Sequence, residues 1–143
     1  MNTAVVPVPD GTGQSKTGSS ANRQAASAVE PMFDLIELLF FAYRDFVADA
    51  DRLLERYKFG RAHHRVLHFV NRRPGLTIAE LLDILRITKQ SLNRVLKELV
   101  AQGYVEPRAG AVDRRQRNLH VTAAGNALAQ ELAQIQSRRF FAA

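Results

Sequence analysis

The segment from Thr88 to Gly103, TKQSLNRVLKELVAQG, constrains the fold most strongly, because it specifies both the ends and the faces of one helix. Its apolar residues share one side at helical spacing: Leu92, Val95, Leu96, Leu99 and Val100. The opposite side and its flanks are polar: Gln90, Ser91, Asn93, Arg94 and Lys97. Thr88 can cap the N-terminus, and Gly103 suits the left-handed position that ends a helix. The exposed amide, hydroxyl and cationic groups are those that contact base edges and phosphates in a DNA major groove.

A shorter helix is predicted just before it, in TIAELLDIL from Thr77 to Leu85. Thr77 and Glu80 have the spacing of a capping box. Its predicted buried face consists of Ile78, Leu81, Leu82 and Leu85. Two short helices with a brief link, the second carrying the polar face, indicate a helix-turn-helix.

After Gly103 the pattern changes to two short strands, Tyr104–Glu106 and Asn118–Val121. Between them, Pro107 to Arg117 forms a glycine-containing hairpin with four arginines and one aspartate. A helix-turn-helix followed by a basic hairpin is a winged helix. The predicted fold class is therefore mainly α with a small β-hairpin wing.

The segment DRRQRNLHVTAAG, from Asp113 to Gly125, resembles the wing signature of the MarR family, and the residues from Leu76 to Val105 resemble that family's helix-turn-helix. The resemblance covers roughly residues 33 to 135. It implies homodimeric winged-helix transcriptional regulators, usually repressors, many of them released from DNA by small lipophilic ligands. The resembled family places its effector cavity between the dimer helices and the winged helix, where Phe40, Tyr43, Val66 and Phe69 would lie. The same side chains are what a core needs, and we expect core packing, so we assign no ligand residues.

The residues expected to contact DNA lie in the polar helix and in the wing: Lys89, Gln90, Ser91, Asn93, Arg94, Lys97, Arg114, Arg115 and Arg117. Asp113 is expected to orient the neighbouring arginines so that the wing keeps its shape. The charge distribution agrees with a DNA partner. Residues 1–58 carry six Lys/Arg and eight Asp/Glu, whereas residues 59–143 carry fourteen and six.

Four segments are expected along the chain. Residues 1–30 are rich in small and polar residues and are predicted to be a disordered tail. Residues 31–59 are predicted to form a dimerisation helix, residues 60–122 the winged helix-turn-helix, and residues 123–143 a C-terminal dimerisation helix. Family members usually continue into a further helix, so this last segment is either truncated or forms a smaller interface, with Phe140 and Phe141 partly filling it.

The first helix, expected from Pro31 to about Lys58, has a heptad-like apolar stripe. The stripe consists of Ile36, Phe40, Tyr43, Val47, Ala50, Leu54 and Tyr57, widened by Leu35, Leu39, Phe46 and Leu53. So broad a stripe needs two partners, namely the rest of its own domain and, we expect, a second subunit.

The next predicted helix, RAHHRVLHFVNRR, carries His64 and His68 at a spacing that can hold a metal ion. No Asp, Glu or Cys accompanies them in this helix, and His63 and Arg65 add potential positive charge. The alternatives are contact with an anionic ligand or plain packing. We therefore predict no metal site and no cofactor.

No catalytic constellation is present in the sequence, and no enzyme is expected. The chain has no cysteine, which excludes disulfides and thiol-based peroxide sensing. With neither a secretory signal nor a membrane-spanning run in the sequence, a cytoplasmic protein associated with the nucleoid is expected. The competing function is a winged helix used for protein contacts, for which a neutral wing and an acidic or apolar helix face would be expected.

Overall fold

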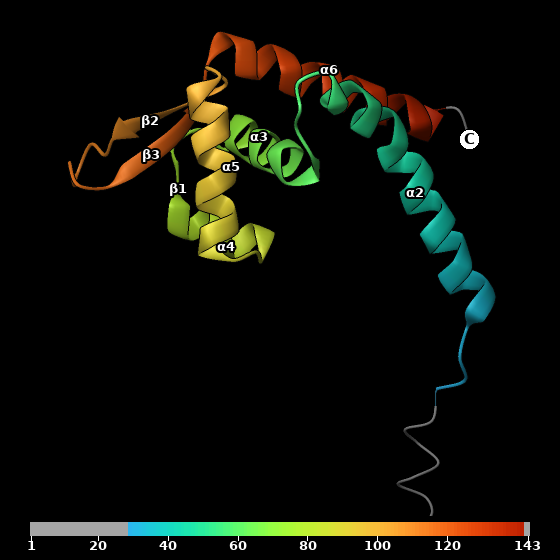
Figure 1. Ribbon diagram of the computed structural model, residues 1–143. Coiled ribbons are helices and arrows are strands. Elements are labelled where there is room, and N and C mark those ends of the chain that lie inside the picture. Colours follow the sequence, from blue (N-terminus) through green and yellow to red (C-terminus); the bar gives the residue numbers. More distant parts are fainter. Residues whose placement is uncertain (1–28, 142–143) are drawn as a thin grey trace, which may run out of the picture. The chain divides into compact units, whose positions relative to one another are not determined.

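The computed structural model describes residues 29–141 (Figure 1). Its elements are α2 (Phe33–Glu55), α3 (Arg61–Arg72), β1 (Leu76–Thr77), α4 (Ile78–Leu85), α5 (Lys89–Ala101), β2 (Val105–Ala109), β3 (Arg117–Val121) and α6 (Ala123–Phe141). The chain divides into two units within α2, one ending at Ile36 and one beginning at Glu37. The first unit contributes the exposed residues 29–36. The tail predicted for residues 1–30 lies outside the described residues, except for Val29 and Glu30.

The first helix is shorter than predicted at both ends. It begins at Phe33 rather than Pro31, and the Met32 carbonyl accepts its first helical bond from the Ile36 N–H at 3.0 Å. It ends at Glu55 rather than near Lys58. Lys58 has a left-handed φ of 58°, which turns the chain towards α3.

The two helices of the helix-turn-helix have the predicted caps. Thr77 Oγ1 accepts from the Glu80 N–H at 3.2 Å, and the Glu80 carboxylate accepts from the Thr77 N–H at 2.9 Å. Thr88 Oγ1 accepts from the Ser91 N–H at 3.1 Å and so caps α5. Gly103 has a φ of 79°, as its predicted position after α5 requires.

The sheet is larger than predicted. Its antiparallel order is β1-β3-β2, with Leu76 opposite Leu119 and Glu106 opposite His120. The strand β2 runs on to Ala109 and β3 begins at Arg117, so Pro107, Arg108 and Arg117 belong to strands rather than to the loop. Pro107 is tolerated because β2 is an edge strand, whose outer side needs no N–H donor.

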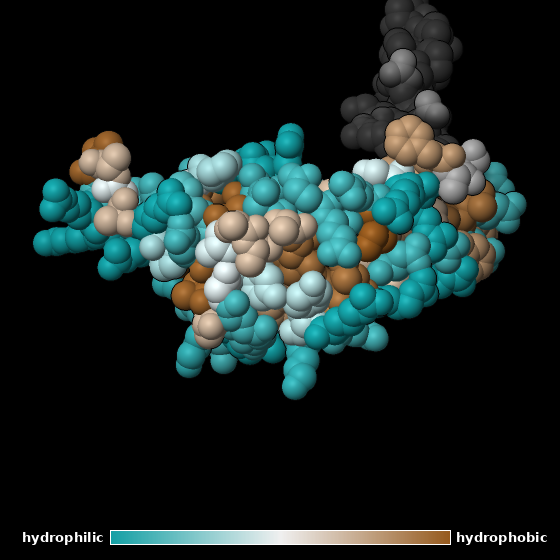
Figure 2. Space-filling model, turned by 90° about the horizontal axis from the view of Figure 1, so that it is seen from above, coloured by the Kyte–Doolittle hydropathy of each residue, from teal (hydrophilic) through white to brown (hydrophobic). Residues whose placement is uncertain are grey.

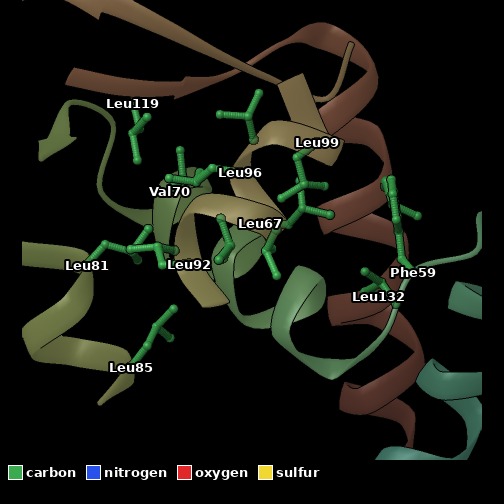
Figure 3. Close-up of a cluster of buried hydrophobic side chains, with 14 of the residues drawn as sticks. Phe59, Leu67, Val70, Leu81, Leu85, Leu92, Leu96, Leu99, Leu119 and Leu132 are labelled. Atoms are coloured by element: carbon green, nitrogen blue, oxygen red, sulfur yellow. The ribbon is translucent and has the colours of Figure 1, made fainter. Parts of the chain in front are cut away.

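The core gathers apolar side chains from all the helices and from the sheet (Figure 3). Leu67 of α3, Leu92 and Leu99 of α5 and Leu132 of α6 have no exposed surface. The buried face predicted for α5 is confirmed at Leu92, Val95, Leu96 and Leu99. It is wrong at Val100, which is 39% exposed. Ile78 and Leu82 of α4 are only partly buried.

The close packing of α6 against the start of β2 depends on Gly125. A Cβ atom at this position would lie 2.0 Å from the Tyr104 carbonyl oxygen, far inside van der Waals contact. Thr122 completes this junction, because its hydroxyl donates to the Gly103 carbonyl at 2.6 Å and accepts from the Gly125 N–H at 3.1 Å. The helix that follows the wing is thus held directly to the end of α5.

The predicted fold class, mainly helical with a small antiparallel wing, is confirmed. The apolar stripe of α2 divides into two parts. Val47, Ala50, Leu53 and Leu54 are buried within the chain, Phe46 is half-buried, and the stripe residues up to Tyr43 are exposed. Leu54, which the heptad spacing would equally place in a subunit seam, has no exposed surface within the single chain.

Candidate nucleic-acid interface

The helix α5 presents the predicted polar side chains to solvent. Its buried leucines and valine face the core, so the opposite face is open. The exposed residues of that face are Lys89, Gln90, Asn93, Arg94 and Lys97. Ser91 is half-buried, and its hydroxyl accepts a hydrogen bond from Thr88 at 3.0 Å. The first turn of α5 carries no acidic residue, so nothing there offsets the positive end of the helix dipole.

The wing is shaped by backbone contacts of Asp113. Its carboxylate accepts from the Arg115 N–H at 2.9 Å, and its carbonyl accepts from the Gln116 N–H at 3.1 Å. Gly110 closes the hairpin through a 2.9 Å bond from its N–H to the Gln116 carbonyl. A Cβ atom on Gly110 would lie 2.5 Å from the Asp113 carbonyl oxygen. The contact observed for Asp113 is therefore with the arginine backbone.

The cations of α5 and of the wing are paired with carboxylates to different extents. Arg108 forms an ion pair with Glu106 on its own strand. By contrast, no ion pair joins Arg94, Lys97, Arg114, Arg115 or Arg117 to a carboxylate of residues 29–141. All five side chains are exposed. Their charge is thus available to a polyanion.

The polar face of α5 and the wing meet around one shallow hollow of about 530 Å³. Asn93 and Lys97 border it from α5, and Arg117 borders it from β3. Its apolar walls include Leu96, Val100, Pro107 and Leu119. Val100 is exposed because it faces this hollow and not the core. The hollow brings together predicted DNA-contacting residues that lie far apart in the sequence.

A second hollow, of about 330 Å³, lies among α2, α3 and α6. It is lined by Tyr43, Phe46, Val47, Asp51, Arg61, His64, Arg65, His68, Phe69 and Gln136. Of the residues suggested by the family resemblance, Tyr43 and Phe69 border this hollow. Val66 instead lies fully in the core, as core packing requires, and Phe40 is 66% exposed.

His64 and His68 both border the second hollow. Burial lowers the pKa of His64, and the neighbouring His68 lowers it further. Burial, followed by the charge of Arg72, lowers the pKa of His68. Within residues 29–141 no group of three potential metal-ligating side chains occurs around them. The surroundings of the pair therefore disfavour the charged form of both rings.

The structural role of His63 was not predicted from the sequence, where this residue counted only as added positive charge. The ring is buried and stacks on Phe59, with 4.7 Å between the ring centroids. Its Nδ1 accepts from the Gly60 N–H at 3.0 Å, so the proton lies on Nε2, which donates to the Glu98 carboxylate at 2.6 Å. His63 therefore joins the start of α3 to α5. A glycine three residues earlier was the only available signal.

The helices and the wing define the chain as a winged-helix protein, and comparison with known proteins agrees. A MarR family profile matches residues 57–116. The HTH-type transcriptional regulator PetP of Rhodobacter capsulatus is 54% identical over 108 residues, which make up 76% of this chain and 65% of that protein. The chain therefore spans slightly less than two thirds of this relative's length.

Solved structures show the same fold. The reduced form of MarR from Escherichia coli superposes with a TM-score of 0.64 at 22% identity, covering 78% of this chain and 80% of that one. MepR, a transcription regulator of the Staphylococcus aureus multidrug efflux pump MepA, gives a TM-score of 0.62 at 18% identity, covering 76% and 78%. The chain is thus similar to MarR family proteins over residues 57–116 and to a HTH-type transcriptional regulator over 108 residues. Of the relatives just described, PetP and MepR are named as transcription regulators.

Within residues 29–141, no helix combines the length and the apolar character needed to cross a bilayer.

Proposed function

We propose that this protein is a homodimeric, sequence-specific DNA-binding repressor of transcription. The observation that carries the proposal is a set of exposed cations on α5 and the wing that form no ion pair with a carboxylate of the described residues: Arg94, Lys97, Arg114, Arg115 and Arg117. An acidic or apolar helix face and a neutral wing would have favoured a protein-interaction module instead. In two symmetric copies, both α5 helices would enter successive major grooves of a palindromic operator. Its half-sites would lie about 10–10.5 base pairs apart, centre to centre.

The second subunit is supported by exposed apolar side chains of α2 and α6. Leu38, Leu39, Phe40, Phe41 and Phe140 are all more than half exposed. We name these five residues the aromatic surface. Apolar side chains reach the molecular surface among hydrophilic ones in Figure 2. Burial of a surface of this kind against a second copy removes it from water.

The hollow among α2, α3 and α6 supports release of the operator by a small molecule. Aromatic walls from Tyr43 and Phe69 accompany cationic groups from Arg61 and Arg65. Such a combination suits a flat lipophilic molecule that carries an anionic group. A protein of this function would act in the cytoplasm, at the nucleoid.

The proposal can be tested by comparing a substitution on α5 with a substitution in the wing. Arg94 is exposed on α5, where an arginine can contact guanine with two hydrogen bonds. Arg94→Ala should lower the ratio of operator to random-DNA affinity. The difference between the two binding free energies should shrink by about 1–3 kcal/mol. Arg115→Ala, in the wing, should weaken both affinities more evenly and lower the salt slope by about one unit per lost phosphate contact.

Fluorescence anisotropy over a salt series measures both variants against an operator selected from random DNA. Loss of discrimination in Arg115→Ala, with discrimination intact in Arg94→Ala, would contradict this assignment. Failure of the unaltered protein to select any sequence, with no salt dependence, would favour the protein-interaction module.

A further inference from the structure

Arg65 of α3 lies at a junction between the second hollow and the helix-turn-helix. Its side chain borders the hollow beside Arg61 and His64. Its Nη2 also donates to the Leu85 carbonyl at 2.8 Å. Leu85 is the last residue of α4. One guanidinium therefore contacts both the hollow and the end of the first helix of the helix-turn-helix.

The carbonyl that Arg65 contacts is one that the helix leaves without an internal partner. The last four carbonyls of an α-helix have no N–H of their own, and the negative end of the helix dipole lies there. The next residue, Arg86, has a left-handed φ of 52°, and Thr88 already caps α5. By holding the Leu85 carbonyl, Arg65 stabilises the turn that sets the start of α5.

The charges around the hollow single out Arg65 as the group that an anion would meet. Arg61 is already paired with Asp51, at 3.0 and 3.1 Å, and lies over the Tyr43 ring. No ion pair joins Arg65 to a carboxylate of residues 29–141. Arg65 is exposed, so its side chain can change partner without unfolding of the chain.

We infer that Arg65 is the residue through which occupation of the hollow controls the helix-turn-helix. An anionic group bound there competes with the Leu85 carbonyl for the guanidinium, because a carboxylate is the stronger acceptor. Loss of the contact frees the turn before α5. The inference rests on the proposed function, in which a small molecule releases the protein from DNA.

A second polar link between α3 and the helix-turn-helix lies outside the hollow. His63 donates to Glu98 of α5 and does not border the hollow. An anion at Arg65 would thus release the turn before α5, while the contact near its C-terminal end persists. The start of α5, which carries Lys89 and Gln90, is the part that would move.

Hydrogen exchange of the full chain tests the contact without any DNA. In Arg65→Gln, amides of residues 85–91 should exchange about tenfold faster, the effect of losing one hydrogen bond to a charged group. Arg61→Gln is the matched control, since it removes the same charge from the same hollow without touching α4. Thermal melts by circular dichroism establish that both variants are folded. Equal exchange in the two variants would overturn the inference.

Benzoate, an aromatic carboxylate, tests the competition. In the unaltered protein it should speed exchange of residues 85–91 and weaken binding to a selected operator. In Arg65→Gln it should change neither quantity. No effect of millimolar benzoate on exchange in the unaltered protein, or the same effect in Arg65→Gln, would refute the competition. Absence of DNA binding in every sample would instead count against the proposed function, and the exchange result would still decide the role of Arg65.

Discussion

The winged helix-turn-helix and the aromatic surface of α2 and α6 differ in how far their apolar side chains are buried. In the first region, Leu67, Leu92 and Leu99 have no exposed surface, and both helices of the motif are capped by their own residues. In the second, Leu39 is 68% exposed and Phe140 meets Phe46 with 5.5 Å between the ring centroids. The first region is complete within one chain. The second leaves apolar area open to water, which is the physical basis for proposing a second subunit.

Truncation of a core leucine should therefore have the largest effect. Leu67→Ala should lower the free energy of unfolding by about 2–5 kcal/mol, because it leaves a cavity in a closed core. Leu39→Ala, the matched control, should cost much less within a single chain because its side chain is exposed. Urea unfolding measures both. A loss in Leu39→Ala as large as that in Leu67→Ala, and independent of protein concentration, would abolish the distinction between the two regions.

The sequence was sufficient to predict the closed region because its signals are local. Capping residues at Thr77 and Thr88 and the glycine at Gly103 act within a few residues of their position, and each does what was expected. The strand β1 was missed because its two residues show no alternation and become a strand only by pairing with Leu119 and Asn118. The extension of β2 through Pro107 was missed for a similar reason, since an edge position is defined only by the assembled sheet.

The aromatic surface of α2 and α6 could not be predicted in the same way. The heptad spacing of α2 is the same at Phe40 and at Leu54, yet the first residue is exposed and the second is in the core. Periodicity identifies an apolar face but not its neighbour. For the same reason the spacing of His64 and His68 suggested a possible metal site. The contact of His63 could not be predicted, because its partner Glu98 lies on another helix.

A charge placed on the aromatic surface should separate association from folding. Leu39→Asp should raise the dissociation constant of the dimer by about 10–100-fold, because an unpaired carboxylate would be buried on association. Its helical circular dichroism should be retained, since Leu39 is exposed in the single chain. Glu37→Asp serves as a control of unchanged charge on an exposed part of the same helix.

Sedimentation over a range of protein concentrations measures this effect. A chain of 16.0 kDa at every micromolar concentration, before any substitution, would remove the basis for the dimer. A loss of helical signal in Leu39→Asp would show that α2 depends on this residue for folding, which contradicts the division between the two regions.

The smallest expected effect is a pH dependence at the hollow among α2, α3 and α6, where the core side of α2 meets α3. The pKa of His64 in the folded chain lies below its ordinary value of 6.5, chiefly because burial disfavours the charged ring. Below about pH 6.5 the unfolded chain therefore binds more protons at this position than the folded chain does, and stability must fall as the pH falls. His68, whose pKa is also lowered by burial, adds to the same trend. Replacing both by glutamine should flatten the loss of the free energy of unfolding between about pH 7 and pH 5, measured by urea unfolding in matched buffers. An undiminished slope in the double variant would mean that other groups cause the acid sensitivity, and that these two rings are not kept neutral by the fold.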